Sequence, residues 1–233
     1  MKNIESRIIN NKRTFAFRSK ELFLEFIKNK KKILIALNAE KLNKNNPELE
    51  KIINDNIGYP DGIGAVWALK RKGLRSAKIP GAELWIAIIN RYYKYKSFYL
   101  IGGKQNVIDE TVLKLRKTYP GIDIKNFRNG YLKKEDKNII KNDLKIKKPD
   151  IVFVAMGSPR QEFIMDYFSK DYSALYMGLG GSFDVYTGHK KRAPKLFVIL
   201  GLEWLYRLLR EPRRWRRQLR YFSFTLKVII NRI

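Results

Sequence analysis

The sequence predicts an α/β fold in which helices flank a mainly parallel sheet, with a helical appendage at the C-terminal end. Continuous apolar runs such as residues 33–37 and 151–155 are too short for helices and are typical of buried strands. Segments with apolar residues at helical spacing alternate with these runs. Alternating strands and helices form right-handed βαβ units, which make a sheet parallel.

The predicted elements follow one another in a regular order. Helices are predicted at residues 19–30, 47–56, 65 onward, 80–95, 105–118, 133–146, 157–168 and 212–233. Strands are predicted at residues 33–37, 98–101, 122–127, 151–155 and 174–177. Only helical patterns follow residue 195. We therefore expect an α/β core at residues 1–195 and a basic amphipathic appendage at residues 196–233.

The net charge is unusually positive, because 49 lysines and arginines face 22 acidic residues, which gives +27. Such a field attracts nucleic acids, phosphorylated ligands or an anionic bilayer. A biased composition rich in Lys, Asn and Ile also explains scattered lysines, but it does not explain the arginines near the C-terminus. The chain has no cysteine and no 18-residue apolar stretch. We therefore expect a cytoplasmic protein without disulfides or a spanning helix.

Small residues follow four of the predicted strands. They are Asn38, Gly102-Gly103, Gly157-Ser158 and the glycine-rich residues 178–181. Ligands of parallel sheets bind at the carboxyl ends of the strands. None of the four stretches is a complete dinucleotide fingerprint or P-loop. Together they predict a rim that a phosphate can approach closely, with helix N-termini directed at it.

A tight turn precedes the helix that begins near Ala65. Pro60 stops the preceding element, while Gly62 and Gly64 allow the turn and a close approach by a ligand. Asp61 therefore lies at or just before a helix N-terminus. Two interpretations stay open at this point: Asp61 is the N-cap of the helix, or it is a carboxylate at the lip of a ligand cleft.

Several short motifs make the chain resemble the WecG/TagA/CpsF family of bacterial glycosyltransferases, and they follow one another in the order found in that family. This family includes the wall-teichoic-acid N-acetylmannosaminyltransferase and the enterobacterial common antigen N-acetylmannosaminuronic acid transferase. The matching stretches are residues 38–40, 60–64, 100–104, 129–131, 157–162, 178–184, 192–194, 201–209 and 211–212. As a set they span residues 33 to about 220 and are highly specific.

The resemblance implies a Rossmann-like fold and a glycosyltransferase without a cofactor. It implies inverting transfer of an N-acetylmannosamine-type sugar from a UDP donor to a lipid-diphosphate-linked N-acetylglucosamine, without a metal ion. The sequence agrees on the metal, because it has no Asp-x-Asp motif and no carboxylate or histidine cluster. His189, the single histidine, lies in a polar loop and is expected to be solvated rather than a ligand.

The resemblance also implies roles for individual residues. Asp61 matches the general base. The implied donor-binding residues are Asn38, Gly102, Gly103, Tyr131, Gln161, Asp184 and Lys78. Gln161 could instead be an exposed residue of a helix's first turn, and Asp184 could be a helix cap. Ala36 replaces the family's threonine and Lys78 its arginine, which leaves open another UDP-hexose or an inactive homologue.

The C-terminal helix carries an apolar stripe formed by Trp215, Leu219, Phe222, Leu226, Ile229 and Ile233. A basic amphipathic helix suits an anionic membrane surface, here the cytoplasmic face, although such a stripe can also pack on a core. By resemblance Arg207, Arg214 and Arg217 hold the acceptor diphosphate. The sequence leaves homo-oligomer formation open. A basic nucleic-acid-binding protein is an alternative interpretation, but the sequence contains no recognised nucleic-acid-binding motif.

Overall fold

The computed structural model describes residues 4–191, 193, 194, 197, 205, 206, 208, 215–230 and 233, with only the backbone at 215–220 and 222. The chain forms two compact units, and each is assembled from separate stretches of sequence. The first unit comprises residues 1–23, 36–80 and 191–233, and the second comprises residues 24–35 and 81–190. The predicted division at residue 195 stays a prediction, because much of the appendage lies outside the described residues.

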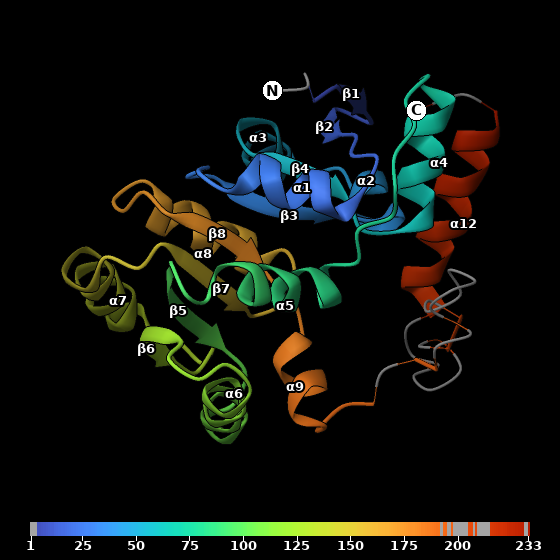
Figure 1. The fold of residues 1–233 in the computed structure, drawn as a ribbon. Coiled ribbons are helices and arrows are strands. Elements are labelled where there is room, and N and C mark those ends of the chain that lie inside the picture. Colours follow the sequence, from blue (N-terminus) through green and yellow to red (C-terminus); the bar gives the residue numbers. More distant parts are fainter. Residues whose placement is uncertain are drawn as a thin grey trace. The chain divides into compact units, whose positions relative to one another are not determined.

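A six-stranded sheet has the order β4-β3-β8-β7-β5-β6 (Figure 1). The pairings β3–β8, β8–β7, β7–β5 and β5–β6 are all parallel, which confirms the predicted α/β class. The division between the units falls within β3 (Ile33–Leu37), between Ile35 and Ala36. Within the part of the chain that the structure describes, no helix is long and apolar enough to cross a bilayer.

The second unit holds most of the sheet. Its strands are β5 (Ser97–Gly102), β6 (Asp123–Arg128), β7 (Ile151–Ala155) and β8 (Leu175–Gly178). Its helices are α5 (Gly81–Tyr92), α6 (Gln105–Thr118), α7 (Lys134–Lys147), α8 (Arg160–Ser169) and α9 (Ser182–Thr187). All except the six-residue α9 were predicted within a few residues. Helix α1 (Lys20–Ile27), also predicted, crosses the division between the units.

Aromatic rings form the centre of the second unit. Trp85 of α5 is almost fully buried and meets Phe153 of β7 edge-on at 5.9 Å between ring centroids. It meets Phe183 and Tyr186 of α9 in the same way, at 5.6 and 5.1 Å. These contacts join α9 to the sheet through one side chain. Burial of such rings dominates the energetics of a core.

A buried tyrosine ties β5 to the neighbouring elements of the second unit. The hydroxyl of Tyr99 donates a hydrogen bond of 2.7 Å to Asp143 of α7, which also accepts from the amide of Asn126 on β6. Burial raises the pKa of Tyr99, and the adjacent Asp143 carboxylate raises it further. The hydroxyl therefore stays protonated and serves as a donor that holds α7 against the sheet.

The first unit contains the N-terminal hairpin, one edge of the sheet and the C-terminal helix. Its remaining elements are β1 (Ser6–Ile9), β2 (Lys12–Phe15), α2 (Ala39–Asn43), α3 (Pro47–Asp55), β4 (Ile57–Pro60), α4 (Ile63–Arg71) and α12 (Trp215–Ile229). Strands β1 and β2 are antiparallel and are joined by Asn10 and Asn11, both at positive φ, as a two-residue hairpin turn requires. Neither strand was predicted, nor were β4 and α2.

Helix α12 has two different apolar faces. Phe224 is fully buried and Val228 nearly so, where α12 packs on α2 and α4. Leu226 and Ile229 belong to the predicted stripe and are 58% and 65% exposed. Leu226 lies two residues from Phe224, about 200° around the helix axis. At Leu226 and Ile229 the alternative that the stripe packs on a core is therefore wrong, whereas the side chains of Trp215, Leu219 and Phe222 lie outside the described residues.

Candidate functional site

The Asp61 turn of the first unit lies beside the end of β3. The backbone N–H of Asp61 donates to the carbonyl oxygen of Leu37 at 3.0 Å, and the Asp61 side chain is half-buried. The N-cap of α4 is Gly62, which makes no side-chain cap hydrogen bond. The interpretation of Asp61 as the N-cap is therefore wrong, and the carboxylate lies one residue outside the cap.

The two glycines of this turn have different neighbours. A Cβ at Gly62 would lie 3.6 Å from Cβ of Asn38, and one at Gly64 would lie 3.1 Å from Cβ of Ala39. The Gly64 position also lies 3.6 Å from the ring of Phe224. The Pro-Asp-Gly-x-Gly motif thus packs on the Asn-Ala-Glu motif, and α12 covers its second glycine. The apolar stripe predicted from the helical period lies on the opposite face of α12, so the burial of Phe224 was not predicted.

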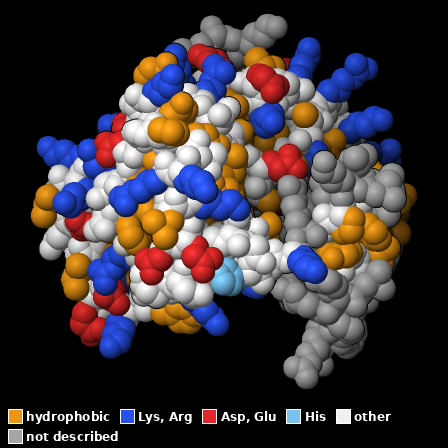
Figure 2. Space-filling view, turned by 60° about the horizontal axis from the view of Figure 1, so that its bottom comes forward, with side chains coloured by type: hydrophobic (Ala, Val, Ile, Leu, Met, Phe, Trp, Pro, Cys, Tyr) orange, Lys and Arg blue, Asp and Glu red, His pale blue; other side chains and the backbone are white. Residues whose placement is uncertain are grey.

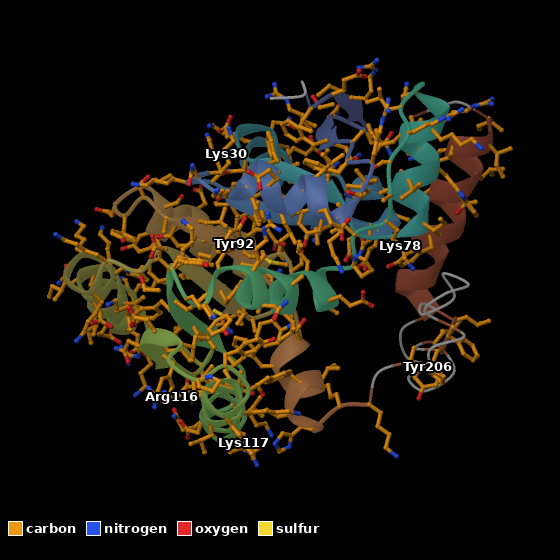
Figure 3. All side chains as sticks on the ribbon, viewed as in Figure 1. Lys30, Lys78, Tyr92, Arg116, Lys117 and Tyr206 are labelled. Carbon is orange, nitrogen blue, oxygen red and sulfur yellow. The ribbon has the colours of Figure 1, made fainter. Side chains whose placement is uncertain are left out.

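Asn38 and Lys78 flank the Asp61 turn within the first unit. Asn38 is the N-cap of α2, and its Oδ1 accepts the backbone N–H of Lys41 at 2.9 Å. Lys78 is half-buried on the stretch between α4 and α5 (Figure 3). The next residue, Ile79, donates its N–H to the carbonyl of Pro60 at 2.8 Å. The structure therefore brings the predicted residues Asn38, Asp61 and Lys78 to neighbouring segments.

Gly102 is the last residue of β5 in the second unit and Gly103 follows it, both at positive φ (141° and 69°). A Cβ at Gly102 would overlap the backbone carbonyl of Ala155 at the end of β7. The N–H of Gly103 donates to that carbonyl at 3.2 Å, and its own carbonyl accepts from Gly130 at 2.9 Å. Only a residue without a side chain permits this approach of three chain segments.

We expect Gly102→Ala to lower the free energy of unfolding by about 3 kcal/mol, because it combines an unfavourable φ with overlap against backbone. Urea unfolding measures the change. Gly121→Ala is the matched control, since Gly121 also has a positive φ (81°) but faces open space. It should cost about 1 kcal/mol. Equal losses for the two variants would show that the contact with Ala155 contributes nothing.

Tyr131 directly follows the loop that contacts Gly103. Its ring is 69% exposed, and its N–H donates to Oδ1 of Asn129 at 2.9 Å. Asn129 in turn donates from Nδ2 to Oε1 of Gln105, at the start of α6. These bonds hold the loop beside Gly102 and Gly103. The predicted residues Gly102, Gly103 and Tyr131 therefore lie together in the second unit.

Gln161 is 4% exposed, so its interpretation as an exposed helix residue is wrong. Its Oε1 accepts the backbone N–H of Gly180 at 2.8 Å, and its Nε2 donates to Oε1 of Glu162 at 3.3 Å. A Cβ at Gly178 would overlap the Gln161 carboxamide. Gly178 thus makes room for Gln161, and Gln161 holds the glycine-rich loop after β8. The sequence placed Gly178 on the rim, and the resemblance assigned Gln161 to donor binding, but their mutual contact was not predicted.

Asp184 lies in the first turn of α9, whose N-cap is Gly181 without a side-chain hydrogen bond. The interpretation of Asp184 as a cap is therefore wrong. Its carboxylate lies 3.8 Å from Nζ of Lys190. His189, next in the chain to Lys190, is exposed and lies 2.9 Å from Glu110 of α6 through its Nε2. The histidine is exposed to solvent, as expected, and it also lies beside a carboxylate of α6, which links the end of α9 to that helix.

The predicted acceptor site falls largely outside the described residues. Arg207 and Arg214 are not among them, and Arg217 is described only as part of the backbone of α12. Their roles stay predictions. Among the residues with described side chains, no group of three or more histidines and carboxylates could hold a metal ion.

The comparison with protein families adds an independent finding to this geometry. The model of the family described as "Glycosyl transferase WecG/TagA/CpsF family" matches residues 14–233, nearly the whole chain. The match covers the second unit, the first unit from residue 14 onward, and every predicted site residue. Within that range the Asp61 turn packs on Asn38, and Gly178 accommodates Gln161. The chain therefore belongs to the WecG/TagA/CpsF family of glycosyltransferases.

Proposed function

We propose that this glycosyltransferase transfers an N-acetylmannosamine-type sugar from a UDP-sugar to a polyprenyl-diphosphate-linked N-acetylglucosamine. The reaction inverts the anomeric centre, needs no metal ion and contributes to a cell-surface polysaccharide such as teichoic acid, capsule or antigen. The proposal rests on the position of Asp61 in a chain of this family. Its carboxylate does not cap α4, and it lies on a turn that packs against Asn38.

Inversion requires a single displacement in which a base takes the proton of the acceptor hydroxyl. A carboxylate does this when it lies within about 3 Å of that proton. We assign this role to Asp61. The bond from the anomeric carbon to the UDP oxygen breaks as the new glycosidic bond forms. Backbone N–H groups, helix N-termini and cationic side chains such as Lys78 offset the negative charge that develops on UDP.

We assign donor binding in the second unit to the glycine rim and the residues that shape it. Gly102 and Gly103 let a phosphate approach the backbone, and Tyr131 presents an exposed ring beside them. Gln161 acts by holding the loop at residues 178–181. We assign Asp184 to the uridine.

We expect Gln161→Ala to raise the KM for the donor about tenfold with a smaller change in kcat. The substitution leaves the N–H of Gly180 without its partner, which loosens the loop after β8. Steady-state kinetics over a range of donor concentrations measures both parameters. Asn138→Ala, which removes an exposed amide from α7, is the control and should leave both unchanged. An unaltered KM together with a lower melting temperature would make Gln161 purely structural.

We assign the acceptor diphosphate to Arg207, Arg214 and Arg217, which can bind it bidentately. We further propose that the protein binds the cytoplasmic face of the membrane peripherally. The exposed Leu226, Ile229 and Ile230 support this assignment, because apolar side chains on a basic helix enter the bilayer interface.

A screen of UDP-sugars with a short-chain lipid-diphosphate N-acetylglucosamine acceptor tests the reaction. UDP release should depend on the acceptor and be fastest with UDP-N-acetylmannosamine. Release with another UDP-hexose would change the sugar but keep the reaction class, an outcome that Ala36 and Lys78 leave open. Absence of acceptor-dependent release from every donor would contradict the proposal.

A further inference from the structure

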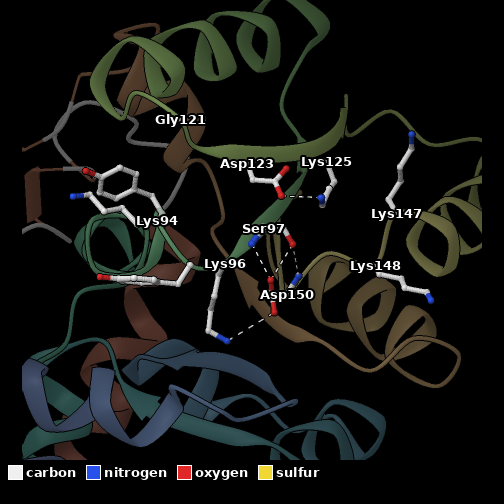
Figure 4. A pocket seen from close by; sticks show the side chains of 11 residues that line it. Lys94, Lys96, Ser97, Gly121, Asp123, Lys125, Lys147, Lys148 and Asp150 are labelled. Carbon is white, nitrogen blue, oxygen red and sulfur yellow. Dashed lines mark hydrogen bonds and ion pairs between the residues drawn. The ribbon is translucent and has the colours of Figure 1, made fainter.

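A polar pocket of about 460 Å³ lies in the second unit, at the amino ends of the strands β5, β6 and β7 (Figure 4). These strands are parallel, so the pocket lies at their amino ends and the glycine rim at their carboxyl ends, on opposite sides of the sheet. Ser97 begins β5, Asp123 begins β6 and Asp150 immediately precedes β7. The pocket is thus separate from the strand ends assigned to the UDP-sugar.

Five lysines and two aspartates line this pocket. Asp123 pairs with Lys125 at 2.8 Å. Asp150 accepts hydrogen bonds of 2.9 Å from both the backbone N–H and the hydroxyl of Ser97, and lies 3.9 Å from Nζ of Lys96. Both carboxylates are therefore occupied. The structure records no carboxylate partner, among the described residues, for Lys94, Lys147 or Lys148.

The lysines come from separate elements. Figure 4 shows Lys94 and Lys96 on one side of the pocket and Lys147 and Lys148 on the other. Lys147 ends α7, and Lys148 is its C-cap, at a φ of 49°. Cations at a helix C-terminus stabilise the helix dipole, which accounts for this pair and also for Lys94 and Lys96, just beyond the end of α5. It does not account for Lys125 of β6, which lines the same pocket.

We propose that this pocket binds a phosphate-bearing anion. An ammonium group binds phosphate as a compact point charge, and three lysines here have no carboxylate partner in the part of the chain that the structure describes. The volume falls within the range of about 300–1,000 Å³ that is typical of small-molecule sites. A concave site lined by one sign of charge also concentrates counter-ions more than a flat surface does.

Calorimetric titration of the full chain with pyrophosphate tests this site, in saturating UDP so that a nucleotide site is occupied. The double variant Lys147→Gln/Lys148→Asn removes two of the free cations, and asparagine tolerates the left-handed backbone at position 148. We expect the Kd for pyrophosphate to rise at least tenfold, which corresponds to about 1.4 kcal/mol. Lys94→Gln, outside α7, should weaken binding in the same direction.

The control is Arg116→Gln/Lys117→Gln, which removes an adjacent basic pair from the last turn of α6 (Figure 3). It changes the net charge equally but touches no part of the pocket, so the Kd should change less than about twofold. Equal weakening by the two pairs, no weakening by either, or no pyrophosphate binding would overturn the site. A protein that fails to bind UDP would contradict the proposed function, yet the contrast between the pairs would still test the pocket.

The source of the anion is tested by competition with vesicles that contain phosphatidylglycerol. Displacement of pyrophosphate from the wild-type chain, lost in Lys147→Gln/Lys148→Asn, would assign the site to a lipid headgroup. Binding that persists in excess vesicles would assign it to a soluble phosphate. Either assignment requires that Lys147→Gln/Lys148→Asn raise the Kd for pyrophosphate at least tenfold while Arg116→Gln/Lys117→Gln leaves it nearly unchanged. Without that difference the site is rejected.

Discussion

Asp61→Asn should lower kcat about 10²–10⁴-fold, the range typical of a lost general base. Asparagine has nearly the same shape but cannot accept the proton of the acceptor hydroxyl. The backbone N–H of Asp61, which bonds to Leu37, is retained, and so is the Gly62 cap of α4. We therefore expect the melting temperature and the affinity for UDP to stay unchanged while turnover with the lipid-linked acceptor falls.

Asp55→Asn is the matched control for this experiment. Asp55 is an exposed carboxylate at the end of α3 in the same unit, paired with Lys51 at 2.8 Å. Exposed pairs of this kind contribute about 0–1 kcal/mol, so both stability and kcat should stay close to wild type. If Asp61→Asn unfolds the protein while its folded fraction turns over normally, Asp61 supports the turn and is not the base.

Phe224→Ala should lower the free energy of unfolding by about 3–5 kcal/mol, the usual cost of removing a buried phenyl ring. Phe224 is fully buried and faces Gly64, where α12 packs against α2 and α4. The small Gly64 leaves nothing to fill the resulting cavity. Chemical unfolding followed by circular dichroism measures the loss.

The opposite face of α12 should behave in the opposite way. Leu226→Gln/Ile229→Gln changes exposed side chains, so stability should stay within about 0.5 kcal/mol of wild type. Sedimentation with vesicles containing phosphatidylglycerol should show a clear loss of binding, because the apolar contact with the interface is removed. Retained vesicle binding would refute membrane contact by this face, and a small effect of Phe224→Ala would refute its packing role.

The lysine and arginine side chains that are spread over the surface do not point to any one ligand. On the face shown in Figure 2, lysine and arginine side chains are spread among carboxylates and apolar groups. This distribution fits the compositional explanation for scattered lysines. The pocket between β5, β6 and β7 differs, because five lysines from separate elements line one concavity. Clustering, rather than the net charge of +27, is what points to a binding site.

Sequence alone determined the elements whose pattern depends only on their own residues. The boundaries of β3, β7 and α6 were predicted to the residue, because buried parallel strands are continuous apolar runs and α6 has a clear helical period. The motif order identified the family, and the glycines at strand ends marked the rim. These features are local, so no knowledge of the partner segments was needed.

Only the tertiary structure decided how these segments meet. Strand β4, at the edge of the sheet, contains Gly58 and Pro60 and has no strand pattern of its own; its neighbours define it. Gln161 is buried because Gly178 leaves room for it. Helix α12 has apolar residues on two faces, and periodicity cannot show which one packs. The buried face is the one that meets α2 and α4, since a hydrophobic contact is defined by both of its surfaces.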